Sequence, residues 1–248
     1  MVGRKWIGLL AVLLLGWAAV PAEAACAPVS HDGRGHVVCT VGATDDLRLW
    51  LRDGDGRVLG GFDRLVAALE AAGERLIFAM NAGMYHADRA PVGLFRGEGG
   101  EEGKLITAPG PGNFGMLPNG VFCILREGGF AVVESRAFVT ASSDCAGATQ
   151  SGPMLVIDGV LHPRFLEDAT SRFVRNGVGV SADGQTAHFA ISDRPVTFHE
   201  FARLFRDALG TPQALYFDGN VSRLHAPDLG RSDRGRQLGP MVGLVAPR

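Results

Sequence analysis

The stretch Ala214–Gly219, ALYFDG, joins a strongly apolar run to an acid and a glycine. Four consecutive apolar residues, 214–217, predict a buried strand in the interior of a sheet. The end of such a strand opens onto whatever pocket the sheet carries, and Gly219 lets the chain turn away beside the carboxylate. Two interpretations of Asp218 follow. It either makes only the local hydrogen bonds of a turn, or it presents a negative charge to a pocket.

Strand patterns outnumber helical patterns in the rest of the chain. Polar and apolar alternation or short apolar runs predict strands at 36–42, 47–51, 75–80, 91–95, 120–125 and 239–245. The turns Asp158-Gly159 and Asp183-Gly184 predict two hairpins, and the glycine-rich residues 97–104 are typical of a solvated hairpin tip. Helical spacing predicts helices at 62–72 and 197–210. We therefore expect one α+β domain, residues 25–248, with a mixed β-sheet core of about ten strands and two main helices.

The first 24 residues have the pattern of a secretory signal peptide. A positive pair, Arg4-Lys5, precedes the apolar run Trp6–Val20, and an Ala-x-Ala site follows at residues 22–24. The apolar run is too short for a comfortable membrane span, which needs about 20 residues. We expect the mature protein to be secreted or periplasmic, with no stable membrane span.

The four cysteines suit an exported protein because they can pair completely. Three pairings are possible among Cys26, Cys39, Cys123 and Cys145, and proximity in sequence favours Cys26–Cys39 with Cys123–Cys145. Lipidation of Cys26 is an alternative, although Glu23 stands where a lipoprotein signal usually has an aliphatic residue. None of the cysteines has the CxxC spacing of a zinc site.

The formal net charge of the whole chain is −2, which argues against nucleic acid as a partner. The informative charges and amides are local. Residues 80–86, 117–122, 149–154 and 175–179 each place an amide, hydroxyl or guanidinium group and a glycine at the end of an apolar run. Glycine there allows a ligand to approach the backbone closely. Each segment alone has an ordinary structural explanation, but their recurrence, with Asp218-Gly219 as a fifth case, predicts a shared polar pocket.

Taken together, the motifs NAGMY, NGVF, ATQSGPMLV, RNGVGV, ISDRPVTFHEFA and LYFDG occur in this order. The chain resembles the bacterial branch of the phosphodiester glycosidase family from about Leu76 to Val245. The resemblance implies hydrolysis of a sugar 1-phosphodiester at the anomeric carbon, here in a bacterial glycan or glycoconjugate.

The resemblance also implies a set of site residues. The family pattern carries onto Asn81, Gly83, Asn119, Gly120, Gln150, Ser151, Gly152, Arg175, Asp193, Asp218 and Gly219. The chain departs from the branch that contains the mannose 6-phosphate uncovering enzyme, where two glycines and two serines follow the Asp-Gly. Here residues 220–223 read NVSR, and only Ser222 has a counterpart, so the expected fold is unaffected and the sugar specificity is open.

The chemistry of the reaction suggests a role for each group. An oxocarbenium-like sugar needs a carboxylate as nucleophile or base, for which Asp218 is the first candidate. Asp193 is the second, or else it orients Arg175 through a salt bridge. The guanidinium of Arg175 suits the phosphate, because it can donate a bidentate pair of hydrogen bonds. The candidates for binding sugar hydroxyls or phosphate oxygens are Asn81, Asn119, Gln150 and Ser151. His86 either donates a hydrogen bond to the phosphate or lies at the rim of the pocket.

Two other functions remain open from the residues alone. The same pocket suits a non-catalytic cell-surface glycan-binding module. It also suits a hydrolase in which Asp218 and Asp193 hold calcium or magnesium, because both ions prefer oxygen ligands. Glu200 is interpreted as the partner of Thr197 in a capping box. Residues 228–235 are either a phosphate-binding or sugar-binding loop or a loop that only wraps a neighbouring strand end.

Overall fold

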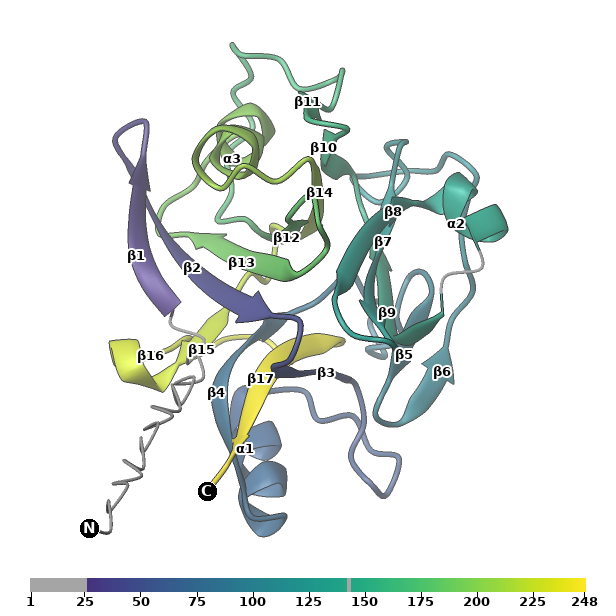
Figure 1. Cartoon of the computed structure of the whole chain (residues 1–248), viewed down its shortest axis with the longest axis vertical. Coiled ribbons are helices and arrows are strands. Elements are labelled where there is room, and N and C mark those ends of the chain that lie inside the picture. The colour runs from purple at the N-terminus through teal and green to yellow at the C-terminus, as the bar shows by residue number, and fades with distance from the viewer. Residues whose placement is uncertain (1–25, 142–143) are drawn as a thin grey trace, which may run out of the picture.

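A computed structural model describes residues 26–141 and 144–248, so the predicted signal peptide, residues 1–24, lies outside the described residues. The described chain forms three antiparallel sheets with three α-helices in one domain (Figure 1). The helices are α1 (Phe62–Ala71), α2 (Ser135–Ala141) and α3 (Phe198–Arg203), which continues as the π-helical turn Leu204–Ala208.

The first sheet has seven strands and carries the site. Its spatial order is β1 (Cys26–His31), β2 (Arg34–Gly42), β13 (Thr186–Ser192), β12 (Asn176–Val180), β14 (Gln213–Asp218), β10 (Met154–Ile157) and β11 (Val160–Leu161). The ALYFD strand is therefore β14, with β12 and β10 as its neighbours. It is buried on both faces, as its apolar sequence predicts.

The other two sheets have five strands each. In the second, the order is β16 (Arg231–Ser232), β15 (Leu224–Ala226), β4 (Glu74–Asn81), β17 (Met241–Pro247) and β3 (Asp46–Trp50). In the third, it is β6 (Gly100–Glu102), β5 (Phe95–Gly97), β9 (Cys145–Ser151), β7 (Gly120–Leu125) and β8 (Phe130–Glu134). Residues 97–104 include the β5–β6 hairpin tip, as predicted.

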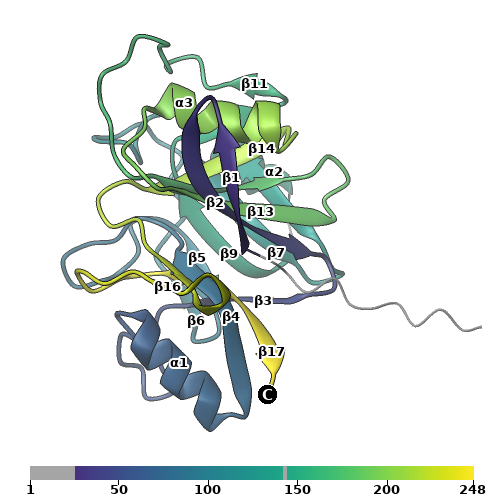
Figure 2. The same cartoon turned by 90° about the vertical axis from the view of Figure 1, so that its left-hand side faces the viewer.

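One apolar core joins the three sheets. Phe189 of the first sheet lies 5.6 Å from Phe78 of the second and 5.5 Å from Phe122 of the third, measured between ring centroids. Helices α1 and α3 cover the outer faces: α3 packs on the first sheet and α1 on the second. They lie at opposite ends of the molecule (Figure 2). The aromatic contacts at the centre hold the three sheets in a fixed relation.

The prediction of a mixed sheet was wrong, because every strand pairing among the described residues is antiparallel. The reason is the strand that lies between the two strands joined by each helical connection. Helix α1 connects β3 to β4, and α3 connects β13 to β14, as in a parallel crossover. In each case another strand, β17 or β12, lies between the two and runs antiparallel to both. The described residues also form 17 strands, more than the ten expected, and α2 adds a third helix.

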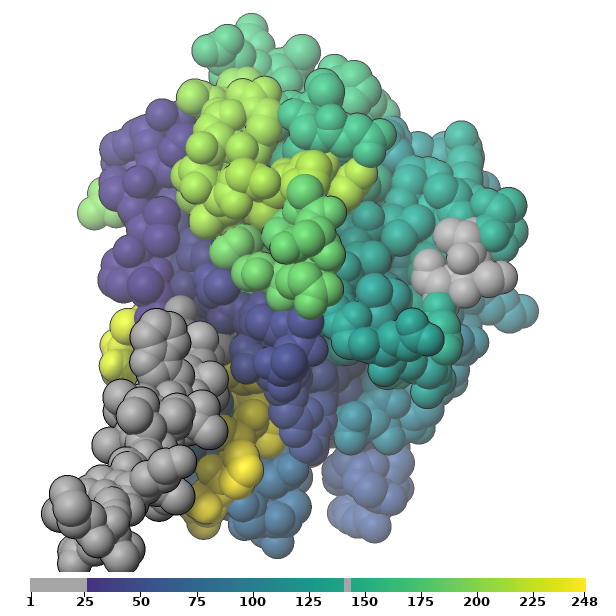
Figure 3. Space-filling view, viewed as in Figure 1, coloured from purple at the N-terminus to yellow at the C-terminus, as the bar shows by residue number. Residues whose placement is uncertain are grey.

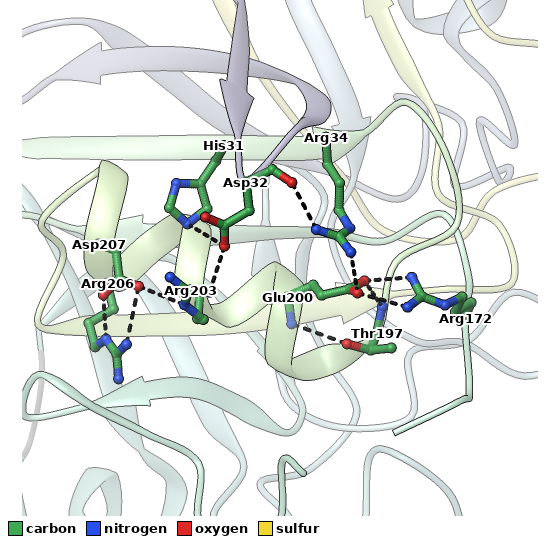
Figure 4. Close-up of polar contacts among 9 residues, drawn as sticks. All are labelled: His31, Asp32, Arg34, Arg172, Thr197, Glu200, Arg203, Arg206 and Asp207. Atoms are coloured by element: carbon green, nitrogen blue, oxygen red, sulfur yellow. Dashed lines mark hydrogen bonds and ion pairs between the residues drawn. The ribbon is translucent and has the colours of Figure 1, made fainter. Parts of the chain in front are cut away.

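Helix α3 begins with the predicted capping box. The Glu200 amide donates to Thr197 Oγ1 (3.1 Å), and the Thr197 amide donates to the Glu200 carboxylate (2.9 Å). The same carboxylate binds Arg34 and Arg172 (Figure 4). Since Arg34 belongs to the β1–β2 hairpin, Glu200 fastens that hairpin to the helix. Their side-by-side packing is visible on the surface (Figure 3).

Both predicted disulfides are present. Cys26–Cys39 joins β1 to β2, and Cys123–Cys145 joins β7 to the start of β9. Each cross-link therefore lies within one sheet, between strands that also share a ladder. Within the described residues, we find no helix with the length and apolar character needed to cross a bilayer.

Candidate functional site

Five segments of the chain surround a pocket of about 730 Å³. The loops that follow β4 and β14 extend to the same side of the molecule, at the left of Figure 2. The described lining residues are Met84, Tyr85, His86, Ala87, Arg89, Val92, Pro111, Gly112, Asn113, Phe114, Phe173, Tyr216, Asp218, Gly219, Asn220, Val221, Arg236 and Gln237. Of the site residues predicted from sequence, this pocket brings together Asp218, Gly219 and His86.

Asp218 is the last residue of β14 and the only Asp or Glu among the described lining residues. Its side chain is buried, with 8 % of the residue exposed. Oδ1 accepts hydrogen bonds from the amides of Gly219 (2.5 Å) and Asn220 (2.7 Å). Burial raises the pKa of this carboxyl above its ordinary value, although bonds from the amides of residues 219–221 act in the opposite direction. A desolvated carboxylate in a pocket has the properties of a nucleophile or base.

A buried amide network holds the turn that carries Asp218. Ser222 Oγ donates to the Asp218 carbonyl (2.8 Å) and to Asn176 Oδ1 (3.1 Å). Asn176 in turn exchanges hydrogen bonds with Asn81 at the end of β4, and Asn81 Oδ1 accepts from the Arg223 amide (2.9 Å). Asn81 and Ser222, which were predicted to bind a ligand, thus hold the turn in place through hydrogen bonds. Asn176 belongs to the RNGVG motif but was not predicted as a site residue.

Only glycine fits at position 219. A Cβ there would lie 2.2 Å from Tyr216 Oη and 3.3 Å from Phe173 Cβ. Both contacts are shorter than nearly all real Cβ contacts, and the first would require atoms to move. The close approach brings the turn directly against the aromatic side of the pocket, so Gly219 sets how near Asp218 lies to Tyr216 and Phe173.

Arg175 does not line this pocket. It lies behind Tyr216, fully buried, and its guanidinium donates to the Val196 carbonyl (2.9 Å), Tyr216 Oη (3.2 Å) and the Ser171 carbonyl (3.2 Å). Its Cζ lies 3.6 Å from the ring centroid of Phe198, a close cation–π contact. The structure therefore places the predicted phosphate clamp in the support of the pocket wall, and burial lowers its pKa.

Asp193 lies in a different hollow, of about 340 Å³, that it shares with Arg34 and Pro195. Its Oδ1 accepts a hydrogen bond from Arg231 Nη1 (3.2 Å). The carboxylate is therefore paired with an arginine of β16, whereas the sequence suggested Arg175 as its partner. The structure does not bring Asp193 and Asp218 into one pocket.

Gln150 is buried and uses its whole side chain inside the protein. Oε1 accepts from the amides of Leu94 (3.2 Å) and Ile106 (3.0 Å), while Nε2 donates to the Ile106 carbonyl (2.6 Å) and Ser135 Oγ (2.8 Å). These bonds fix the segment around residue 106, which leads to the pocket wall at residues 111–114. Gln150 therefore shapes the pocket from outside it.

The remaining predicted residues are also part of the scaffold. Ser151 Oγ donates to the Phe217 carbonyl (2.9 Å), and Asn119 Nδ2 donates to the Phe114 carbonyl (3.0 Å). A Cβ on Gly152 would lie 2.6 Å from Asn119 Cβ, so these two segments pack backbone to side chain. Gly83 has φ +145°, and Gly120 lies under the side chains of Met154 and Leu215.

Several lining residues were not predicted from sequence. Phe173 is 42 % exposed and presents an aromatic face, while Arg89 and Arg236 give the rim positive charge. Tyr85 donates to the Gln237 carbonyl (2.8 Å) and joins the loop after β4 to the loop before β17. Tyr85 was within reach of the sequence reasoning, since it stands in the NAGMYH segment beside His86. The other three had no signal because they come from loops without a recognisable motif.

The described residues contain no group of three or more His, Cys, Asp and Glu side chains arranged to hold a metal ion. Asp218 and Asp193, which the sequence offered as ligands of one cation, lie in separate hollows.

Comparisons with known proteins agree on one family. The sequence pattern of the phosphodiester glycosidase family matches residues 74–235. The uncharacterized protein YigE of Escherichia coli K12 is 34 % identical over 182 residues, which are 73 % of this chain and 70 % of that protein. The catalytic domain of zebrafish N-acetylglucosamine-1-phosphodiester alpha-N-acetylglucosaminidase, solved in a form auto-inhibited by its pro-peptide, superposes with a TM-score of 0.60. This superposition covers 90 % of this chain and 82 % of that one at 12 % identity, and it shows a shared fold. The chain belongs to the phosphodiester glycosidase family.

Proposed function

We propose that this protein hydrolyses sugar 1-phosphodiesters, with Asp218 as the carboxylate that acts at the anomeric carbon. The observation that carries the proposal is a single desolvated carboxylate at the base of a pocket whose rim bears Arg89 and Arg236. A sugar with a phosphate on C1 is a ligand that needs both a carboxylate near the ring and positive charge beside the leaving group.

The pocket suits the bond changes of this reaction. The C1–O bond to phosphate breaks, its electron pair stays on the phosphate oxygen, and C1 becomes oxocarbenium-like. Asp218 either bonds to C1 first, after which water attacks C1 and the bond to the carboxylate breaks, or it takes a proton from the water that attacks C1 directly. Because phosphate leaves readily as an anion, the leaving oxygen needs neutralisation more than a proton. One carboxylate in the pocket is then sufficient, where ordinary glycosidases use two.

The aromatic and positive residues divide the pocket between sugar and phosphate. Phe173 offers an exposed aromatic ring of the kind that covers the apolar face of a sugar, and it lies beside Gly219. The phosphate is left to the rim, where His86, Arg89 and Arg236 can donate hydrogen bonds. We assign Arg175 a positioning role through Tyr216, and we place Asp193 outside the reacting pocket.

The cellular setting is part of the proposal. Two disulfides within the described chain suit an oxidising compartment. With the predicted signal peptide, they support export and a substrate outside the cytoplasm, such as a bacterial glycan or glycoconjugate that contains phosphodiester-linked sugars.

A panel of sugar 1-phosphodiesters tests the proposal when incubated with the mature protein and assayed for released sugar. Aryl glycosides of the same sugars, which lack phosphate, serve as the comparison. We expect turnover of at least one phosphodiester and much weaker turnover of its aryl glycoside. Binding of the phosphodiesters without any turnover would contradict the proposal and would indicate a glycan-binding module.

A further inference from the structure

Arg223 is a buried cation whose hydrogen-bonding capacity is largely unused. It stands two residues after the pocket-lining Val221, and the residue is 9 % exposed. Its side-chain atoms Nε and Nη2 are shielded from solvent and have no hydrogen-bond partner among the described residues. Buried N–H groups are nearly always paired, and guanidinium N–H groups are strong donors. An acceptor from outside the chain would complete the site.

The position of Arg223 relates it to the pocket wall. Its Cδ, Nη1 and Cζ lie 3.6–3.7 Å from where a Cβ on Gly235 would stand, so the guanidinium packs against the backbone that leads directly to the pocket-lining Arg236. Arg223 also acts electrostatically on Tyr85, together with Arg89 and Arg236. Arg89 and Arg236 line the pocket together with Tyr85, and Arg223 packs behind the wall at Gly235, so three positive charges lie on this side of the pocket.

The nearest acid does not neutralise this cluster. Asp233 accepts hydrogen bonds from Arg231 Nε (3.1 Å) and Nη2 (2.9 Å) and from the Leu224 amide (3.0 Å). Its carboxylate is thus committed to a neighbouring arginine and to the backbone, although its field still reaches Arg223. A buried cation left without a close counter-charge is costly, so such a residue points to an anionic ligand.

A comparison with Arg175 sharpens the point. Arg175 is equally buried, but all three of its nitrogens donate to acceptors within the protein, and an aromatic ring covers its face. The protein itself therefore satisfies the hydrogen-bond donors of Arg175. Arg223 has the free donors and the chemical fork that phosphate oxygens require.

We propose that Arg223, with Arg89 and Arg236, forms the phosphate subsite of the pocket on its Tyr85 side. The inference rests on the proposed function and deepens it: the phosphate of a sugar 1-phosphodiester docks on Arg223, and the sugar extends toward Asp218. Free phosphate, which resembles the leaving group, then binds the same subsite and competes with substrate.

Inorganic phosphate is the probe, and binding to the mature protein is measured by calorimetry and by the shift in melting temperature. We expect wild-type protein to bind phosphate and to be stabilised by it. Arg223→Met removes the charge but keeps much of the volume. Without phosphate this variant should melt at or above the wild-type temperature, because a buried uncompensated charge is gone, and its phosphate affinity should fall by at least about tenfold. Arg234→Met, an exposed arginine of the loop after β16, next to Gly235, is the matched control and should bind as wild type does.

Either of two results would overturn the inference: wild-type protein does not bind phosphate, or Arg223→Met binds phosphate with wild-type affinity. If Arg223→Met does not fold, Arg223→Lys decides, since it keeps the charge without the fork and should still bind at least about tenfold more weakly. Phosphate binding that depends on Arg223 in a protein that cleaves no sugar phosphodiester would uphold the subsite and reject the proposed reaction. Cleavage of a sugar phosphodiester by wild type, together with unchanged phosphate affinity in Arg223→Met, would uphold the proposed reaction and reject the subsite.

Discussion

At the scale of single residues, Asp218 lies in a buried position that disfavours the charged form of its carboxyl group. Burial raises its pKa, and only the amides of the turn oppose that effect. A turn that needed nothing but local hydrogen bonds would be served equally well by asparagine. The charge therefore has a stability cost that the turn geometry does not explain and that the proposed catalytic role would explain.

His36 gives the protein a pH-dependent stability that is independent of the pocket. It is buried beside Phe201, and burial lowers its pKa from 6.5 to about 4, with Asp193 opposing and His31 and Arg34 reinforcing the effect. The folded state keeps the ring neutral while the unfolded state charges it. Stability from this group is therefore full above pH 6.5 and is lost as the pH falls toward 4, by up to about 3 kcal/mol.

Urea unfolding between pH 7 and 4 measures this loss. We expect His36→Leu to show a shallower decline in the free energy of unfolding over that range than wild type shows. An identical decline in both proteins would mean that His36 is not the group responsible.

The sequence predicted some site residues and not others, for a local reason. Asp218 and Gly219 could be found because they stand at the end of an apolar strand, and His86 because it closes the polar segment that follows another such strand. The same rule selected Asn81 and Gln150, whose hydrogen bonds prove to lie inside the fold. A sequence shows that a polar group ends a strand, but not whether its partners are protein atoms or a ligand.

At the scale of elements, Arg175 is the main link between β12 and the segments that flank the pocket. It stands one residue before β12 and donates to carbonyls in the stretches around residues 171 and 196. It also supports Tyr216 of β14. The wall of the pocket thus depends on a charge that no ligand in this pocket needs to touch.

Arg175→Met should therefore weaken the whole fold. Each buried acceptor left unpaired costs about 1–3 kcal/mol, so we expect the free energy of unfolding to fall by about 3 kcal/mol or more. The exposed Arg172, paired with Glu200, is the control, and Arg172→Met should cost less than about 1 kcal/mol. Any remaining activity of Arg175→Met should fall alike on phosphodiesters and aryl glycosides. A selective loss on phosphodiesters would instead return Arg175 to the phosphate.

The β1–β2 hairpin is fastened by a disulfide as well as by the Glu200 network. A cross-link that closes a loop of about 15 residues stabilises a protein by about 3 kcal/mol in the chain-entropy model. Cys26→Ser with Cys39→Ser should lower the free energy of unfolding by about that amount in urea titrations. A loss below about 1 kcal/mol would show that the ladder and ion pairs hold the hairpin without the cross-link.

Local patterns predicted most elements but not their partners. The helices at 62–72 and 197–210 and the two hairpins were predicted and are confirmed. Strand β9 was missed, because the sequence CAGATQS has little of the β-branched, apolar character of a typical strand. The insertion of β17 between β3 and β4 pairs residues almost 200 positions apart, which no local pattern reveals.

At the scale of the whole molecule, three sheets around one core bring distant loops to a common pocket. The resemblance to the family, predicted from the order of the motifs, is confirmed by residues 74–235. The positively charged side of the pocket could not be predicted in the same way. Arg89, Arg223 and Arg236 come from separate loops, and only the folded chain places them near Tyr85.

Export of the whole protein is tested by its intact mass. Protein purified from the periplasm or medium should begin near Ala25 and should lack the mass of four hydrogen atoms relative to the fully reduced chain, as two disulfides require. Four free thiols or a lipid on Cys26 would refute this prediction.

The central claim is that Asp218 acts through its charge, and Asp218→Asn tests it most directly, since asparagine keeps the shape and the acceptor oxygen. The decisive measurement is kcat/KM on a sugar 1-phosphodiester that wild type cleaves, together with the melting temperature at pH 7. We predict a loss of at least about a hundredfold, equivalent to roughly 2.7 kcal/mol in barrier height. Because the folded state raises the Asp218 pKa, removing the charge should leave the melting temperature at or above that of wild type. Full activity in Asp218→Asn, or a variant that no longer folds, would contradict the account.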